Sequence, residues 1–164
     1  VEATTQNVLS NDYQSFGLEL EGLFEYKGFN ARGALTWVDA EIVDNDANVN
    51  IGNTPRRQPG LSYNFMPAYS FKGGHSISMS VMGQTQSYAQ DNNDLIMPGY
   101  TIVNAVGSLY ITKKTRLNLS VNNLTNAMGI TESEEGSIVE GQTNFIRARS
   151  IPGRTMIASI NIFF

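Results

Sequence analysis

The sequence of 164 residues contains no cysteine, one histidine, one tryptophan and five prolines. Without cysteine, the chain can form neither a disulfide framework nor a thiolate metal site. The single histidine, His75, stands beside an expected turn and is interpreted as a solvated turn residue rather than a base or a metal ligand. Because no histidine accompanies a candidate serine nucleophile, the sequence argues against an enzyme.

Long hydrophobic runs and an excess of positive charge are also missing. No apolar run approaches the roughly 18 residues that a membrane-spanning helix needs, which excludes a helical membrane protein but not a barrel. Eleven Lys and Arg residues oppose fifteen Asp and Glu residues, so the net charge is −4 and nucleic acid is not an expected partner. No glycine-rich loop follows a strand and opens a helix, and we expect no cofactor.

The sequence is rich in alternation with a period of two. Within residues 15–26 the even positions, from Phe16 to Tyr26, are apolar, aromatic or glycine, whereas Glu19 and Glu21 occupy odd positions. This pattern is typical of β-strands with one apolar face. Seven runs alternate in this way: 15–26, 29–41, 61–71, 76–88, 100–112, 116–124 and 154–164.

The connections between these runs alternate in length. The short ones are 27–28, 72–75 and 113–115, and the long ones are 42–60, 89–99 and 126–152. Tight periplasmic turns and long extracellular loops are the signature of outer-membrane barrels, so we assign the two kinds of connection accordingly. Pro67, inside the third run, cannot donate a hydrogen bond to a sheet ladder and is an awkward residue for a strand.

Aromatic residues gather at the ends of the runs. Phe16 and Tyr26 lie ten residues apart on one face, and in a tilted strand this spacing corresponds to roughly 25 Å, the height between the two aromatic girdles of a barrel. The expected membrane girdle comprises Phe16, Trp37 and Tyr63 on the extracellular side and Tyr26, Phe29, Tyr69, Phe71 and Phe164 on the periplasmic side. These patterns predict an all-β, antiparallel transmembrane barrel segment that contacts outer-membrane lipid and lipopolysaccharide, and they disfavour a soluble β-sandwich.

The odd number of runs bears on domain organisation. Seven strands joined by alternating turns leave the first and last strands running in the same direction, so these two cannot pair antiparallel. Bacterial single-chain barrels have an even number of strands, and we therefore expect further strands outside this sequence. Residues 1–13, which lack the pattern of a signal peptide, are expected to be the remnant of an extracellular loop. Residues 14–164 would be the C-terminal part of an outer-membrane β-barrel.

Four motifs follow one another along the chain. They are residues 52–59 (GNTPRRQP), 97–104 (MPGYTIVN), 119–126 (LSVNNLTN) and 148–154 (ARSIPGR). In this order and spacing, with the terminal strand that ends at Phe164, they resemble TonB-dependent outer-membrane receptors. The resemblance extends over nearly the whole chain, from about Ser15 to Phe164.

The resemblance implies a barrel of about 22 strands with a plugged lumen, of which this chain supplies the last seven. It implies active uptake of a large, scarce nutrient such as a ferric siderophore, cobalamin or an oligosaccharide, in the outer membrane of a Gram-negative cell. TonB would act through an N-terminal plug that this sequence lacks, and the terminal strand resembles the signal read by the barrel-assembly machinery. A structural or binding barrel without TonB-coupled transport is the alternative.

Two groups of loop residues are candidates for substrate binding: Arg56, Arg57, Arg147 and Arg149 near strand ends, and Asp91, Asn92 and Asn93 within one loop. The arginines suit plug or substrate carboxylates, although we favour structural or lipopolysaccharide-phosphate contacts. The second group suits sugar hydroxyls or calcium, although clustered Asp and Asn more often simply form turns. No metal site is assigned. The strand glutamates Glu19, Glu21 and Glu25 are expected to face a wet lumen or the plug.

Overall fold

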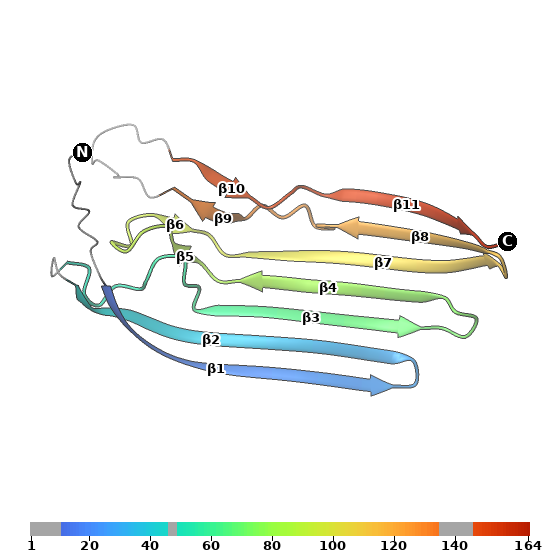
Figure 1. Ribbon diagram of the computed structural model, residues 1–164, viewed down its shortest axis with the longest axis horizontal. Helices are drawn as coiled ribbons and strands as arrows, with labels where there is room; N and C mark the ends of the chain where they lie inside the picture. Colours follow the sequence, from blue (N-terminus) through green and yellow to red (C-terminus); the bar gives the residue numbers. More distant parts are fainter. Residues whose placement is uncertain (1–10, 46–48, 135–145) are drawn as a thin grey trace, which may run out of the picture.

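The computed structural model describes residues 11–45, 49–134 and 146–164, and these form an antiparallel sheet of seven strands with two small two-stranded sheets (Figure 1). The large sheet runs in chain order through β1 (Asn11–Tyr26), β2 (Phe29–Asn45), β3 (Leu61–Ser70), β4 (Ser76–Gln84), β7 (Tyr100–Thr112), β8 (Thr115–Asn122) and β11 (Thr155–Ile162). One small sheet pairs β5 (Ser87–Tyr88) with β6 (Ile96–Met97), and the other pairs β9 (Ile130–Ser133) with β10 (Ala148–Ser150). The sheet confirms the predicted all-β antiparallel fold.

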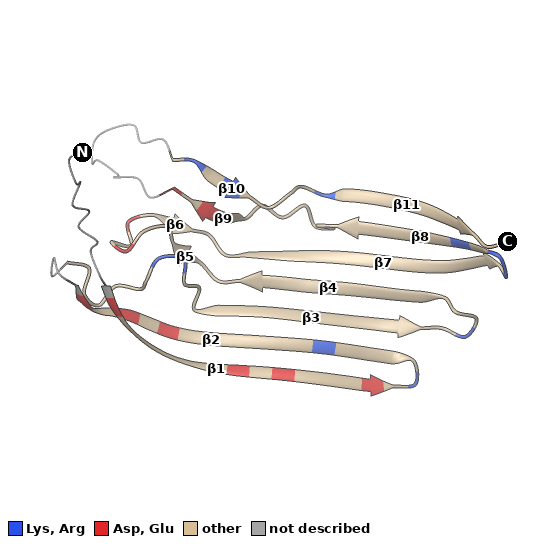
Figure 2. Ribbon diagram, in the orientation of Figure 1, with Lys and Arg blue, Asp and Glu red and all other residues tan. Residues whose placement is uncertain are grey.

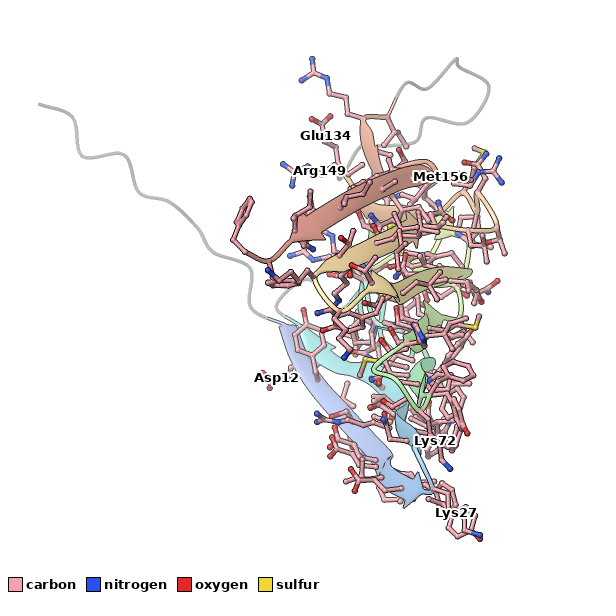
Figure 3. All side chains as sticks on the ribbon, turned by 90° about the vertical axis from the view of Figure 1, so that its right-hand side faces the viewer. Asp12, Lys27, Lys72, Glu134, Arg149 and Met156 are labelled. Atoms are coloured by element: carbon pink, nitrogen blue, oxygen red, sulfur yellow. The ribbon has the colours of Figure 1, made fainter. Side chains whose placement is uncertain are left out.

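The strand register places unlike residues on the two faces of the sheet, because side chains alternate along each strand. One row across the strands, on what we call the outer face, comprises Leu20, Leu35, Tyr63, Gly83 and Thr101. The adjacent row, on the inner face, comprises Glu21, Ala34, Asn64, Met82 and Ile102. Figure 3, viewed from the short-turn end, shows side chains projecting from both faces.

The outer face is apolar and uncovered. Leu18, Leu20, Ile160 and Ile162 are 60–70 % exposed, so none of them packs into a protein core. A soluble sandwich would bury such side chains against a second sheet, whereas a barrel wall presents them to lipid. No helix among the described residues is long and apolar enough to span a membrane.

The two ends of the sheet differ as the connection lengths predict. The turns after β1, β3 and β7 lie at one end, together with the C-terminus, and the long connections lie at the other (Figure 1). The tight turn has positive φ values of 45° at Lys27 and 87° at Gly28, and glycine adopts the second without steric cost. Strands β1 and β11 form opposite edges and point in the same direction, so the described strands make an open sheet.

Several strand boundaries were predicted wrongly. Strand β1 begins at Asn11, so residues 11–13, expected in a loop, extend the strand; residues 1–10 lie outside the described part of the chain. Strand β2, expected to end at 41, continues to Asn45. Its polar end still pairs with β1, across a register shift between Asp12 and Tyr13. The fourth run, expected to reach 88, breaks after Gln84, and its last residues form β5.

Pro67 disturbs the sheet where the sequence indicated. The ladder between β3 and β4 includes the pairs Phe65–Val81 and Ala68–Ser78 but no pair for the two residues between them, Met66 and Pro67. The register is unchanged across this gap, so the strand continues past it. The ladder is interrupted here because proline has no backbone N–H to donate to the neighbouring strand.

Apart from Ala31 in β2, the buried apolar residues of the described part of the chain collect at the long-connection end of the molecule. Ile42 and Ala89 are fully buried, and Met97 and Ile151 are at most 9 % exposed. Residues 42–45, 49–60, 85–99, 123–134 and 146–154, which we call the loop cap, therefore pack together at the long-connection end of the sheet. The expected loops 89–99 and 126–152 thus contain short paired strands, β6 in the first and β9 and β10 in the second.

Candidate functional site

The residues predicted to form a membrane girdle lie at the two ends of the strands. Near the loop cap, the rings of Phe16 and Trp37 meet edge to face, with centroids 6.0 Å apart. At the short-turn end, the rings of Tyr69 and Phe71 are 4.6 Å apart, and Tyr26 lies under the ammonium of Lys27. Phe29 pairs with Tyr69, Tyr63 pairs with Leu35 nearer the cap, and Phe164 ends the chain at the short-turn end. Lipid contact by these side chains stays a prediction.

The ring of Tyr63 lies against a glycine, Gly83, on the neighbouring strand. A Cβ on Gly83 would lie 2.6 Å from the Tyr63 hydroxyl oxygen, so only glycine leaves room for the ring. Across this glycine, the hydroxyl of Tyr63 reaches that of Thr101 at 2.5 Å. A polar group on an apolar face is thereby satisfied within the sheet.

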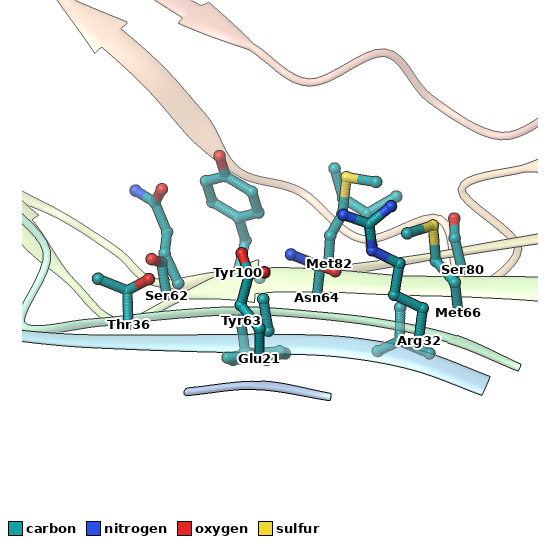
Figure 4. A pocket seen from close by; sticks show the side chains of 15 residues that line it. Glu21, Arg32, Thr36, Ser62, Tyr63, Asn64, Met66, Ser80, Met82 and Tyr100 are labelled. Atoms are coloured by element: carbon teal, nitrogen blue, oxygen red, sulfur yellow. The ribbon is translucent and has the colours of Figure 1, made fainter. Parts of the chain in front are cut away.

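The inner face carries an open hollow of about 600 Å³ whose lining mixes polar and apolar side chains. Its lining includes Glu21 from β1, Arg32 from β2, Asn64 from β3 and Tyr100 from β7, and Figure 4 shows these side chains along the strands. Figure 2 shows further acidic residues along β1. Because Glu19 and Glu25 are spaced from Glu21 by an even number of residues along β1, the three share the inner face; whether a plug or water covers them stays a prediction.

Three of the predicted arginines meet at one hollow in the loop cap. Arg57, Arg147 and Arg149, from segments about 90 residues apart in sequence, line a space of about 400 Å³ together with Glu132 and Glu134. The Arg57 guanidinium donates to the carbonyl oxygen of Ser133 at 3.0 Å. Two exposed ion pairs cross the β9–β10 hairpin, Arg149 to Glu132 at 3.1 Å and Arg147 to Glu134 at 3.8 Å. The sequence did not reveal that these arginines lie together.

The other predicted site residues tie two loops to each other. A carboxylate oxygen of Asp91 accepts from the backbone N–H of Arg56 at 2.9 Å. The side chain of Asn93 both accepts from the N–H of Thr54 (3.0 Å) and donates to its carbonyl (2.8 Å). The amide of Asn92 donates to Asp94 within the same loop, at 2.8 Å. These contacts give the cluster a structural role, and its ligand contacts stay a prediction; no group of three metal-ligating residues occurs in the described part of the chain.

Two residues matter more than the sequence suggested. The Nδ1 atom of His75 accepts from the backbone N–H of Tyr110 at 3.0 Å, and this bond continues the β4–β7 pairing past its last pair, Ser76–Ser108. The side chain of His75 thus satisfies a backbone N–H at the end of a strand pair and is not simply a solvated turn residue. Asn123 is 3 % exposed and forms hydrogen bonds with two separate parts of the last long connection. In the sequence, only its position inside the 119–126 motif indicated that it matters.

The comparisons with known proteins agree with this geometry. The profile of the family described as TonB dependent receptor-like, β-barrel matches residues 2–124, three quarters of the chain. No curated protein matches the chain.

Several solved structures share the fold at low sequence identity. The siderophore receptor PiuA of Acinetobacter baumannii (TM-score 0.79, 18 % identity) covers 93 % of this chain and the ferric yersiniabactin uptake receptor FyuA of Yersinia pestis (0.76, 18 %) covers 94 %. BauA, the ferric preacinetobactin receptor of A. baumannii (0.69, 17 %), covers 93 %. The chain spans 22–24 % of the length of these three. The profile match shows that the chain belongs to the TonB-dependent receptor β-barrel family, a family of receptors rather than enzymes.

Proposed function

We propose that this chain is part of the wall of a TonB-dependent receptor in the outer membrane of a Gram-negative cell, and that the receptor takes up ferric siderophores. The observation that carries the proposal is the convergence of Arg57, Arg147 and Arg149 on one hollow at the loop end of a sheet with an apolar outer face and a polar inner face. A ligand arriving from outside would meet this hollow first.

The chemistry of the hollow favours a ferric siderophore over cobalamin or an oligosaccharide. Ferric iron is held by hard, often negatively charged oxygen donors, and guanidinium groups recognise such oxygens through paired hydrogen bonds. Three arginines oppose two glutamates in the hollow, so an anionic group can displace a glutamate from its exposed ion pair at small cost. Sugar hydroxyls gain less from arginine. The receptors FyuA and BauA, similar in fold, are named for ferric siderophores.

The proposal includes the partners that this family implies. A plug would occupy the lumen against the inner-face glutamates of β1, and TonB would drive transport through that plug. Further strands would pair with the free edges of β1 and β11 to close the barrel. Outer-membrane lipid and lipopolysaccharide would cover the outer face, and the barrel-assembly machinery would insert the protein.

The test is uptake by the full-length protein that contains this chain, expressed in a Gram-negative strain without its own siderophore receptors. Cells are given radioactive iron bound to yersiniabactin or preacinetobactin, with labelled cobalamin and a maltooligosaccharide as comparison ligands. The proposal expects iron accumulation that stops when TonB is deleted. Accumulation of cobalamin or sugar alone would contradict the siderophore assignment, and uptake that persists without TonB would contradict the mechanism.

A further inference from the structure

Asn123 lies where β8 ends and the last long connection begins, and it is 3 % exposed. Its φ of 50° is a left-handed conformation that asparagine tolerates better than most residues. Resting on the proposed function, we infer that Asn123 is the positioning residue of the ligand site. It holds both ends of the connection that carries Arg147 and Arg149 against the barrel wall.

The side chain of Asn123 closes this connection at its base. Its Nδ2 donates to the carbonyl oxygens of Ala127 and Pro152, both at 2.9 Å, and its Oδ1 accepts from the N–H of Ala127 at 2.8 Å. Both donors of the amide are therefore used. Ala127 lies four residues ahead and Pro152 twenty-nine, so one side chain brings the start and the end of the connection together.

The backbone of Asn123 ties the same point to the inner face of the sheet. Its N–H donates to the Oδ1 of Asn104 on β7 at 2.9 Å, and the Nδ2 of Asn104 donates to the hydroxyl of Ser80 on β4 at 3.0 Å. Asn104 and Ser80 are paired neighbours in the sheet. A polar chain of three residues therefore runs from the wall to the base of the last connection.

Neighbouring residues reinforce the base without replacing Asn123. The Oδ1 of Asn126 accepts from the N–H of Arg154 at 3.0 Å, and the N–H of Ile151 donates to the carbonyl of Gly129 at 2.9 Å. Above the base, the β9–β10 hairpin is held at Ser133 by Arg57 from another loop. The hairpin is thus held by Arg57 above, and the base of its connection is joined to the wall by Asn123 together with the bond from Leu124 N–H to the carbonyl of Val103 on β7 (2.7 Å).

The chemistry of the site explains why asparagine fits it. Aspartate has the same shape but would replace two donors with a charged acceptor facing two carbonyl oxygens. Glycine keeps the left-handed backbone and removes the amide. Asn123→Gly therefore separates the hydrogen bonds of the side chain from the backbone conformation. Asn122→Gly is the matched control, because the neighbouring side chain is exposed and bonds to Thr155 on β11.

The first test needs no ligand. Spin labels are attached through Ile51→Cys in the loop cap and Thr131→Cys on the hairpin of the full-length protein in bilayers, and the distance between them is measured by pulsed electron resonance; this chain contributes no other cysteine. We expect Asn123→Gly to broaden the distance distribution and Asn122→Gly to leave it unchanged, with equal heat-modifiable migration of the folded barrels. An unchanged distribution in folded Asn123→Gly protein would overturn the inference.

The second test separates positioning from general stability. With the ferric siderophore that the unmodified receptor transports, we expect Asn123→Gly, which removes three hydrogen bonds, to raise the half-saturating concentration at least about tenfold, the factor that a net loss of one to two buried hydrogen bonds already produces. The maximal uptake rate per folded receptor should stay unchanged. A fall in maximal rate with unchanged half-saturation would contradict a positioning role. If the unmodified receptor transports no siderophore, the proposed function fails, and the spin-label distances still decide the inference.

Discussion

The seven-stranded sheet outside the loop cap, which we call the wall, leaves apolar side chains exposed, whereas the loop cap buries side chains of the same kinds. Ile160 on β11 is 62 % exposed, whereas Ile42, at the cap end of β2, is fully buried. In the wall, apolar side chains face outward and meet no other protein layer in the described residues. In the cap, isoleucine, alanine and methionine pack inward under hydrogen-bonded loops. The wall therefore depends on its surroundings for its hydrophobic stabilisation, and the cap supplies its own.

The difference follows from where each region satisfies its backbone. Strand hydrogen bonds satisfy most of the backbone inside the wall between neighbouring strands, so either face can be apolar. Loop backbone has no such ladder and must find partners by folding back on itself, as in the bonds from Ile42 N–H to Asn53 O (2.9 Å) and from Gly52 N–H to Ile42 O (2.8 Å). Burial of Ile42 accompanies those bonds. The loops thus acquire a small core of their own, and a wall that faces lipid, as proposed, needs none.

The largest expected effect lies in the cap. Ile42→Ala leaves a cavity in a site with no exposure, and we expect it to destabilise the cap by about 2–5 kcal/mol. Faster hydrogen exchange at the amides of Ile42 and Gly52, with unchanged exchange in β7, would report this local opening. Val43→Ala, at a 38 % exposed neighbour, is the control. Equal exchange in the two variants would contradict the burial of Ile42 in the cap.

The next effect tests the outer face of the wall. Leu20→Arg places a charge at the expected middle of the membrane, where arginine costs about 2–4 kcal/mol. Glu21→Arg, one residue along, places the same charge on the polar inner face. Urea unfolding from bilayers is expected to show the loss for Leu20→Arg and little change for Glu21→Arg. If both variants lose equal stability, the two faces do not meet different solvents.

A smaller effect sharpens the packing of the wall itself. A Cβ at Gly83 would lie 2.5 Å from the carbonyl oxygen of Tyr100 and 2.6 Å from the Tyr63 hydroxyl, and we expect Gly83→Ala to cost about 1–3 kcal/mol. Gly107, also on the outer face, has open space around its Cβ position. Gly107→Ala should therefore be close to neutral in the same unfolding assay. A neutral Gly83→Ala would show that the Tyr63 ring lies elsewhere.

The smallest effect concerns the exposed charges of the cap. The Arg149–Glu132 pair joins side chains that are 78 % and 54 % exposed, so a double-mutant cycle with alanine should give a coupling of about 0.2–1 kcal/mol. Ligand uptake should respond more strongly to Arg149→Ala than to Glu132→Ala, because only the arginine suits an anion. Equal losses of uptake in the two variants would indicate that the pair serves the fold alone.

The wall could be predicted from the sequence because its signals are local. Period-two alternation and short turns such as Lys27–Gly28 act within a few residues, and they identified seven strands and their antiparallel order. The loop cap could not be predicted in this way. Ile42 was assigned to the start of a loop, because nothing nearby in sequence indicates that Gly52 and Asn53 return to pair with it.

The candidate site likewise could be predicted only in part, because its contacts join residues far apart in the sequence. Arg57, Arg147 and Arg149 were named from the sequence, but their common hollow depends on the β9–β10 hairpin docking on a distant loop. The sequence does not distinguish Asn123 from the other residues of its motif, because its partners Asn104 and Pro152 lie far away along the chain. His75 was interpreted as a solvated turn residue, because its bond to Tyr110 crosses to another strand.

The central claim is that lipid covers the outer face of this sheet and water or protein covers the inner face. Single cysteines along β1, from Phe16 to Tyr26, can be spin-labelled one at a time in the full-length protein in bilayers. Collision with oxygen, which concentrates in lipid, is then compared with collision with a water-soluble nickel chelate. The account predicts high oxygen access at even positions such as Leu20 and low access at odd positions such as Glu21, with a period of two throughout. Equal access at both sets of positions, or the opposite phase, would contradict it.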